Sequence, residues 1–275
     1  MSTTTLERPA ATVSDNIVVT QRRVLVSEWL KLRSLRSTVW TLVVAVGMTI
    51  GIGVLVGLIF HSHWAHMRPE EKMRFDPTED TLRGAMFAQL AIGVLGVLMI
   101  TGEYSTGMIR ATMSAVPKRL PVLWAKLAVF TAVGAVTMLI STFAAFLIGQ
   151  ALLAPTAPHT TLSAPHVLRA VVGAGLYLTV VGALGLAIGF IVRNTAGAIS
   201  TLFGVLLLLP IVGELLPESW TSHFIGWLPS NAGQQLMTLH PDPHMLAPWS
   251  GFALFVGYVA AAIVVAAVVV KRRDA

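Results

Sequence analysis

The sequence contains no cysteine, and only 12% of its 275 residues are charged. The absence of cysteine excludes a disulfide framework and a cysteine-ligated metal site. Charged residues make up about a quarter of a typical soluble domain, so this low content argues against a soluble chain. Hydrophobic residues account for 55% of the sequence, and the mean hydropathy is +0.75. The composition therefore predicts an integral membrane protein.

Signatures of nucleotide binding and of intramembrane catalysis are also absent. The chain has no Gly-x-x-x-x-Gly-Lys-Ser/Thr loop to cradle phosphates, no His-Glu-x-x-His for zinc and no Gly-x-Ser-x-Gly nucleophile turn. Histidines at 61, 63 and 66, and the "HPDPH" stretch at 240–244, have a spacing that suits a metal or a pH sensor. We interpret them as polar residues at an interface, because metal sites usually need a firmer ligand set. We expect no catalytic residue, no metal site and no cofactor in this chain.

Six apolar runs are long enough to cross the hydrocarbon core of a bilayer, which takes roughly 20 helical residues. The third run is longer than needed but contains no turn signal, so we interpret it as one tilted helix. The predicted fold class is an all-α integral membrane protein with six transmembrane helices. The predicted spans are residues 39–60, 84–101, 122–154, 167–192, 196–216 and 248–270.

The distribution of lysine and arginine predicts the topology. With the N-terminus inside, fourteen of the nineteen cations and only five of the thirteen acids lie on the cytoplasmic side. Both termini are then cytoplasmic. The pI of about 10.2 follows from this asymmetry, so nucleic acid is not a necessary partner. Residues 1–21 show no signal peptide and are interpreted as a disordered cytoplasmic leader, before a permease domain at 22–275.

The predicted spans contain few ionisable groups. Lys126 and Glu214 lie near span ends, where we interpret them as interfacial side chains that snorkel to water. This sparseness disfavours a proton- or sodium-coupled carrier. Pairs of glycines four residues apart allow close helix approach, which we assign mainly to packing within the six-helix unit and, as the alternative, to a subunit interface. These pairs are Gly47/Gly51, Gly53/Gly57 and Gly185/Gly189.

The segment "RRVLVSEWLKLRSLRSTVW" at 22–40 predicts a basic amphipathic helix in the inner membrane interface. At helical spacing its apolar residues share one broad face, and Glu28 and Arg33 interrupt the pattern. The apolar face holds Leu25, Val26, Trp29, Leu30 and Leu32, and the polar face holds Arg23, Ser27, Lys31 and Ser34.

The segment "TGEYSTGMIRATMSAVPKRLP" at 101–121 predicts a short cytoplasmic helix between the second and third spans. We expect Gly102 to break the second span and Ser105 or Thr106 to cap the new helix. Pro117 should end that helix, and Pro121 suits the first turn of the third span. One face is apolar and must cover the membrane, its own bundle or another protein. That face holds Met108, Ile109, Thr112, Met113 and Val116.

The long outer segment at 216–248 is rich in aromatic residues and proline and has no lysine or arginine. We expect interfacial or re-entrant helices there, with Trp220 and Trp227 as anchors in the aromatic belt.

Several of these stretches resemble one family. "SEWLKLRSLRSTVWTL" is similar to the region before the first span of ABC transporter permeases, in particular the type-2, exporter-like permeases common in actinobacteria. "GEYSTGMIRATMSAVPKRLPVLWAKL" resembles the loop between their second and third spans, and "WLPSNAGQ" and "KRRDA" also look like this group. The resemblance covers about residues 22–275, and the order of the motifs around six spans carries it.

The resemblance implies a transport subunit, not an enzyme, that sits in the plasma membrane beside a second copy or a homologous permease and surrounding lipid. A separate ABC ATP-binding subunit would bind ATP and Mg²⁺. The helix before the first span would be an elbow helix, and the loop after the second span a coupling helix. The resemblance implies Glu103 and Gly107 as ATPase-coupling residues. The helical spacing adds Met108, Ile109 and Met113 of the same short helix, and we include its cation Arg110. Implied elbow-helix residues are Glu28, Trp29, Lys31 and Arg33.

The sequence thus predicts the permease subunit of an ATP-driven exporter of a hydrophobic or amphipathic compound. Two alternatives remain open at this point: an ion-coupled carrier or channel, and a membrane protein that assembles or senses without transporting.

Overall fold

The computed structural model describes residues 20–116, 118–215, 224–242 and 245–272, and within these ranges every regular element is a helix. Some predicted features lie outside the described residues: most of the leader, Pro117, Trp220, His244 and the end of the "KRRDA" stretch. The elements are α1 (Gln21–Ser34), α2 (Arg36–His63), η1 (Trp64–His66), α3 (Pro69–Arg74), α4 (Pro77–Leu82), α5 (Gly84–Ser105), α6 (Met108–Ala115), α7 (Leu120–Leu153), α8 (Val167–Val192), α9 (Thr195–Phe203), η2 (Gly204–Leu208), α10 (Leu209–Glu214), η3 (Ile225–Trp227), α12 (Pro229–Gln234), η4 (Gln235–Met237) and α13 (Pro248–Arg272).

Six helical segments of the described chain are long and apolar enough to cross a membrane, which confirms the six predicted spans. The second segment starts earlier than predicted, because the short helix α4 leads almost directly into α5. The fifth is one continuous rod in which η2 is a π-helical turn between α9 and α10. The segments are Arg36–His66, Pro77–Ser105, Leu120–Leu153, Val167–Val192, Thr195–Glu214 and Pro248–Arg272.

Helices α5 and α8 form the centre of the bundle and pack closely on each other. A Cβ atom added at Gly185 would lie 2.1 Å from the carbonyl oxygen of Gly93, so only glycine allows this approach. Gly53 and Gly57 likewise face α7, which confirms packing within the bundle for these glycine pairs. The pair Gly47/Gly51 differs, because a Cβ there would meet nothing within 4 Å.

The described part of the outer segment folds into the short helices η3, α12 and η4, as predicted, but these are buried more deeply than an interfacial helix. Ala232 and Leu236 are fully buried against α13 and α8, where Gly251 and Gly173 leave room for their backbone. Trp227 remains exposed, as an anchor in the aromatic belt requires.

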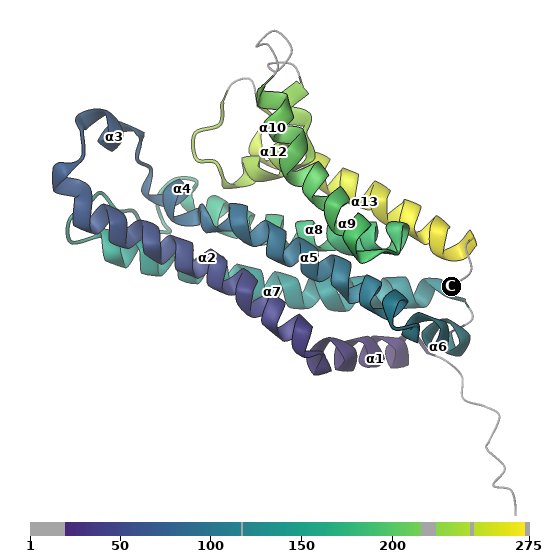
Figure 1. The fold of residues 1–275 in the computed structure, drawn as a ribbon. Coiled ribbons are helices and arrows are strands. Elements are labelled where there is room, and N and C mark those ends of the chain that lie inside the picture. The colour runs from purple at the N-terminus through teal and green to yellow at the C-terminus, as the bar shows by residue number, and fades with distance from the viewer. Residues whose placement is uncertain (1–19, 117, 216–223, 243–244, 273–275) are drawn as a thin grey trace, which may run out of the picture.

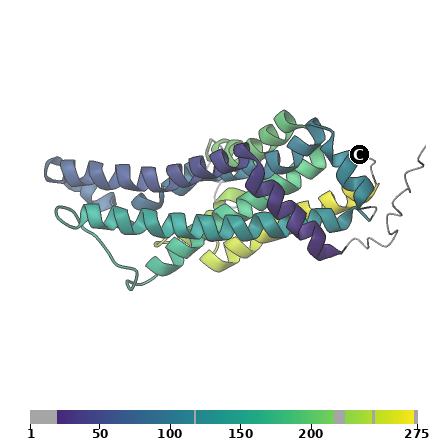
Figure 2. The same ribbon diagram turned by 90° about the horizontal axis from the view of Figure 1, so that it is seen from below.

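Both short helices predicted near the cytoplasmic side lie at one end of the bundle. Helices α1 and α6 are found there with the C-terminal end of α13, while α3 lies at the opposite end (Figure 1). Seen from below, α1 crosses α7 obliquely (Figure 2). This crossing brings the polar groups of α1 against the start of the third span.

Candidate functional site

Four charged side chains from three helices meet where α1 crosses the bundle, and we call them the charge cluster: Glu28, Lys31, Glu103 and Lys126. The Lys126 Nζ lies 2.5 Å from Glu28 Oε2 and 2.9 Å from Glu103 Oε1. The Lys31 Nζ lies 2.9 Å from Glu28 Oε1 and 3.0 Å from Glu103 Oε1. Lys31 also donates a hydrogen bond of 3.3 Å to Thr112 Oγ1. The cluster therefore connects α1, α5 and α7 to α6.

The charge cluster is buried and electrically neutral. Glu28 and Lys126 are each 1% exposed and Glu103 is 4% exposed, while Lys31 is partly exposed. Burial alone would lower the pKa of the Lys31 ammonium, but its hydrogen bond to Glu28 and the charges of Glu103 and Glu28 together raise that pKa above its usual value. Two carboxylates and two ammonium groups balance, which is the condition under which buried charges are tolerated.

One oxygen in the cluster has spare bonding capacity. The Glu103 Oε2 is buried and has no hydrogen-bond partner among the described residues, whereas Oε1 accepts from both lysines. An unsatisfied buried acceptor carries a desolvation penalty. Glu103 therefore keeps one oxygen available to a further hydrogen-bond donor.

Lys126 corrects one prediction from the sequence. It was interpreted as a snorkelling side chain at the end of a span, but it is enclosed and paired with two carboxylates. Its position explains the difference, because α7 begins at Leu120 with Pro121 in its first turn, as predicted, and the next turns lie beneath α1. The partners are 98 and 23 positions away in the sequence, so local pattern gives no sign of the pairing.

Helix α1, for which the resemblance implies the role of an elbow helix, presents its two faces differently from the prediction. Glu28, which interrupts the apolar pattern, lies on the buried face together with Val24 and Leu32. Trp29 is 46% exposed, and Leu30 is also exposed. The predicted apolar face is therefore divided: Leu32 packs on the bundle, while Trp29 and Leu30 face its surroundings, as expected for a helix lying in the membrane interface. The predicted elbow residue Arg33 is exposed on the same side of the helix as Trp29.

The break between α5 and α6 lies at a different glycine from the predicted Gly102. The helix α5 continues through Gly102 as far as Ser105, and the chain turns at Gly107, which has a φ of +73°. This left-handed conformation is accessible to glycine at little cost, which explains why the turn occurs there. No side chain caps α6, so the prediction of a cap at Ser105 or Thr106 is wrong.

The apolar face of α6 covers its own bundle. Ile109 and Met113 are buried in the main core, and Val116 is buried in a smaller cluster with residues of α1 and α7. Met108 is 39% exposed and Arg110 is exposed. Among the predicted coupling residues, Gly107, Met108 and Arg110 therefore form an accessible surface, while Glu103, Ile109 and Met113 lie underneath it.

A groove of about 350 Å³ separates α1 from α6 directly above the charge cluster. Ala111 and Ala115 of α6 form one wall, and Val24 and Ser27 of α1 form part of the other. Glu28, Lys31 and Thr112 also line it.

The histidines at the opposite end of the molecule do not gather into a metal site. Among the described residues, no group of three or more histidine, cysteine, aspartate or glutamate side chains could hold a metal ion. The His61 Nδ1 lies 3.0 Å from the carbonyl oxygen of Leu152 and 3.0 Å from Thr156 Oγ1. His61 therefore ties the end of α2 to the end of α7.

Comparison with protein families agrees with this architecture. The family model described as "ABC-2 family transporter protein" matches residues 24–212, more than half of the chain and all of the charge cluster. No individual curated protein matches the sequence. Permeases of this family are membrane transport subunits that partner with an ABC ATP-binding subunit and are not ATPases themselves. With its six membrane-spanning helices, the chain is a multi-pass membrane protein that belongs to the ABC-2 transporter family.

Proposed function

We propose that this chain is the membrane half of an ATP-driven exporter of the type common in actinobacteria, and that it moves a hydrophobic or amphipathic compound across the plasma membrane. A separate subunit binds ATP and Mg²⁺, and a second copy of this chain or a homologous permease completes the translocation path. Both termini face the cytoplasm, in agreement with the concentration of cations at that end.

The observation that carries this proposal is the connection between α6 and the spans through the charge cluster. A buried ion cluster often adds little net stability compared with apolar residues of the same volume. Such a cluster instead fixes the relative positions of the helices that carry its charged side chains. Here the cluster holds α1, α5 and α7 in register, and Thr112 brings α6 into the same set of bonds.

The accessible surface of α6 supplies the contact for the ATPase. Met108 and Arg110 combine an apolar and a cationic side chain on a short exposed helix, and such residue types are enriched at the centres of protein interfaces. Ile109 and Met113 anchor α6 to the bundle below. Force applied to the outer surface of α6 is therefore transmitted to α5 through the short turn at Gly107, and to α1 through the bond from Lys31 to Thr112.

Copurification with the ATPase tests the contact surface. The chain is expressed with its ATP-binding subunit, and the amount of ATPase retained is compared between the wild type and the double variant Met108→Ala/Arg110→Ala. Loss of two interface residues worth more than 1 kcal/mol each reduces affinity by about tenfold or more. Arg74→Ala serves as the control, because Arg74 is an exposed arginine on α3 at the opposite end of the molecule.

Transport distinguishes the proposal from its alternatives. In proteoliposomes containing both subunits, ATP should drive movement of an amphipathic cargo, and Met108→Ala/Arg110→Ala should abolish it while Arg74→Ala does not. Transport by this chain alone under a pH or sodium gradient would establish an ion-coupled carrier instead. Recovery of a kinase or an envelope enzyme with no ATPase would establish an assembly or sensing role.

A further inference from the structure

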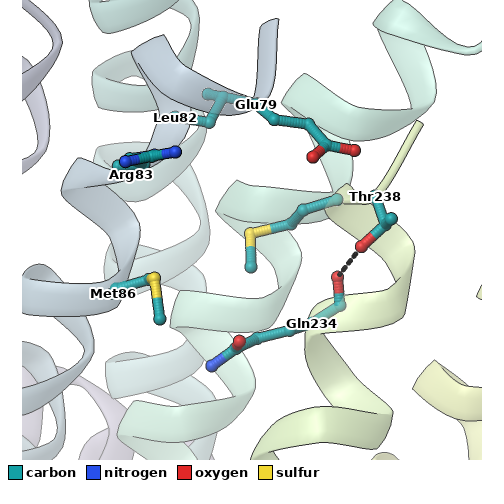
Figure 3. A pocket seen from close by; sticks show the side chains of 7 residues that line it. Glu79, Leu82, Arg83, Met86, Gln234 and Thr238 are labelled. Carbon is teal, nitrogen blue, oxygen red and sulfur yellow. Dashed lines mark hydrogen bonds between the residues drawn. The ribbon is translucent and has the colours of Figure 1, made fainter. Parts of the chain in front are cut away.

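A second polar pocket lies at the other end of the bundle, where the second span begins (Figure 3). Its volume is about 180 Å³. One side is formed by α4 and the start of α5, and the other by α12, η4 and the residue that follows them. The lining residues are Glu79, Leu82, Arg83, Met86, Gln234, Met237 and Thr238.

The polar groups of this pocket are held in place by neighbouring residues. The Glu79 Oε1 accepts a hydrogen bond of 2.6 Å from the backbone N–H of Leu239. The Arg83 guanidinium lies 2.6 Å from Asp80 Oδ1, with 64% of its side chain exposed. The Gln234 amide donates a hydrogen bond of 3.3 Å to the Tyr177 hydroxyl. Groups fixed before a ligand arrives bind it at a lower entropic cost.

The two charged side chains that line the pocket, those of Glu79 and Arg83, have opposite signs. Asp80, which does not line the pocket, pairs with Arg83. Arg169 does not line the pocket, but it donates a hydrogen bond of 2.6 Å to the carbonyl oxygen of Thr238. The peptide unit between Thr238 and Leu239 is therefore held by an acid at one end and a cation at the other. A lining that carries one acid and one cation favours a zwitterion over a ligand with net charge.

A further acid, Asp76, and a histidine, His240, lie nearby. The Asp76 carboxylate caps α4 by accepting hydrogen bonds from the backbone N–H groups of Thr78 and Glu79, and it lies 3.7 Å from His240 Nε2. Neither Asp76 nor His240 lines the pocket. The charged side chains available to a ligand are thus Glu79 and Arg83.

The pocket also has an apolar side that continues onto the surface of the bundle. Leu82, Met86 and Met237 line it, and thioether side chains adapt readily to ligands of different shape. Met86 is 49% exposed, and the neighbouring Phe87 is 54% exposed. Both belong to the early part of the second membrane-spanning segment, so an apolar chain beside them would run along that span.

From this arrangement we infer that the pocket binds the zwitterionic head group of an amphiphile, one that carries an ammonium group and an anionic oxygen group. The ammonium group pairs with Glu79 and the anionic oxygens pair with Arg83, while the apolar chain lies along Met86 and Phe87. The volume supports a head group as the occupant, because pockets for drug-sized molecules measure roughly 300–1,000 Å³. The site is independent of ATP coupling, so binding is measured without the ATPase.

The test uses the purified full chain in a neutral detergent and three probes. Dihexanoyl phosphatidylethanolamine presents the zwitterion on an apolar body, dihexanoyl phosphatidylglycerol presents an anion on the same body, and phosphoethanolamine presents the zwitterionic head alone. Calorimetry should show binding of the first probe and at least tenfold weaker binding of the second. Weak binding of phosphoethanolamine identifies a lipid as the source of the head group, and equal binding identifies a water-soluble zwitterion for the same pocket.

Variants assign the binding to this pocket. Glu79→Gln retains an oxygen that can accept from Leu239 but loses the charge, and Arg83→Gln removes the cation. Each should weaken phosphatidylethanolamine binding about tenfold, the effect of losing one charge-assisted hydrogen bond. Glu70→Gln and Arg74→Gln are the matched controls, because both residues are exposed on α3 outside the pocket. Equal binding of the two lipids, or unchanged binding in both pocket variants with unaltered melting temperatures, overturns the inference.

Discussion

Replacing Lys126 by methionine removes the ammonium group at the centre of the charge cluster while keeping a side chain of similar length. Glu28 and Glu103 then share only Lys31, so three charged groups remain with a net charge of −1. Lys31 is the more exposed of the two lysines, and it cannot reach the positions that Lys126 occupied while it keeps its own bonds. The variant therefore leaves a buried carboxylate without full compensation.

The expected loss of stability is about 3–5 kcal/mol, the usual effect of removing one partner from a buried ion pair. For chains of more than 150 residues, a change of 1 kcal/mol shifts the melting temperature by roughly 2 °C or somewhat more. Lys126→Met should accordingly lower the melting temperature by about 6–10 °C. The double variant Glu103→Gln/Lys126→Met leaves Glu28 and Lys31 as a neutral pair, so it should recover more than half of that loss.

The measurement is the melting temperature of the purified chain in detergent, followed by intrinsic tryptophan fluorescence. Lys118→Met is the matched control, because Lys118 is an exposed lysine at the same end of the bundle and should shift the melting temperature by less than about 1 °C. If Lys126→Met melts like the control, or if the double variant is less stable than the single one, the account of the charge cluster as a compensated buried set is refuted.

Two further predictions concern packing and pH. Gly185→Ala places a Cβ 2.1 Å from the carbonyl oxygen of Gly93 and should separate α5 from α8, lowering the melting temperature by several degrees, whereas Gly47→Ala, with nothing within 4 Å, should leave it unchanged. Equal effects of the two alanines on thermal unfolding would contradict the central position of α5 and α8. The raised pKa of Lys31 predicts that its contribution to stability is fully present below a pH of about 10.5 and is lost as the pH rises through the raised pKa. The difference in melting temperature between the wild type and Lys31→Met should therefore be constant from pH 7 to 9 and shrink only above about pH 10.5. If that difference already disappears at pH 8, the pKa of Lys31 is not raised by its two carboxylate partners.

The helices could be predicted from the sequence, because each depends on residues that are adjacent in the chain. Each span is a continuous apolar run, and a bilayer imposes the same length requirement on every helix, so six runs gave six spans. Periodicity also predicted helices at 22–40 and 101–121, and the structure contains α1 and α6 in these stretches.

The arrangement of the site could not be predicted in the same way, because its interactions join distant parts of the chain. Glu28 looked like an irregularity in an amphipathic pattern, and only the position of α7 shows that it pairs with Lys126. Local sequence also favoured Gly102 over Gly107 as the break after the second span. The structure keeps Gly102 helical because the residues on either side of it, Thr101 and Glu103, are buried by tertiary contacts.

The position of the charge cluster along the chain has a consequence for synthesis. Glu28 and Glu103 both precede Lys126, so each carboxylate is made before the lysine that lies closest to the centre of the cluster. A span that carries an unpaired lysine enters lipid less favourably than an apolar one. When α7 leaves the ribosome, the complementary charge of α5 is already at the membrane. The third span can thus insert beside a helix whose carboxylate pairs with its lysine.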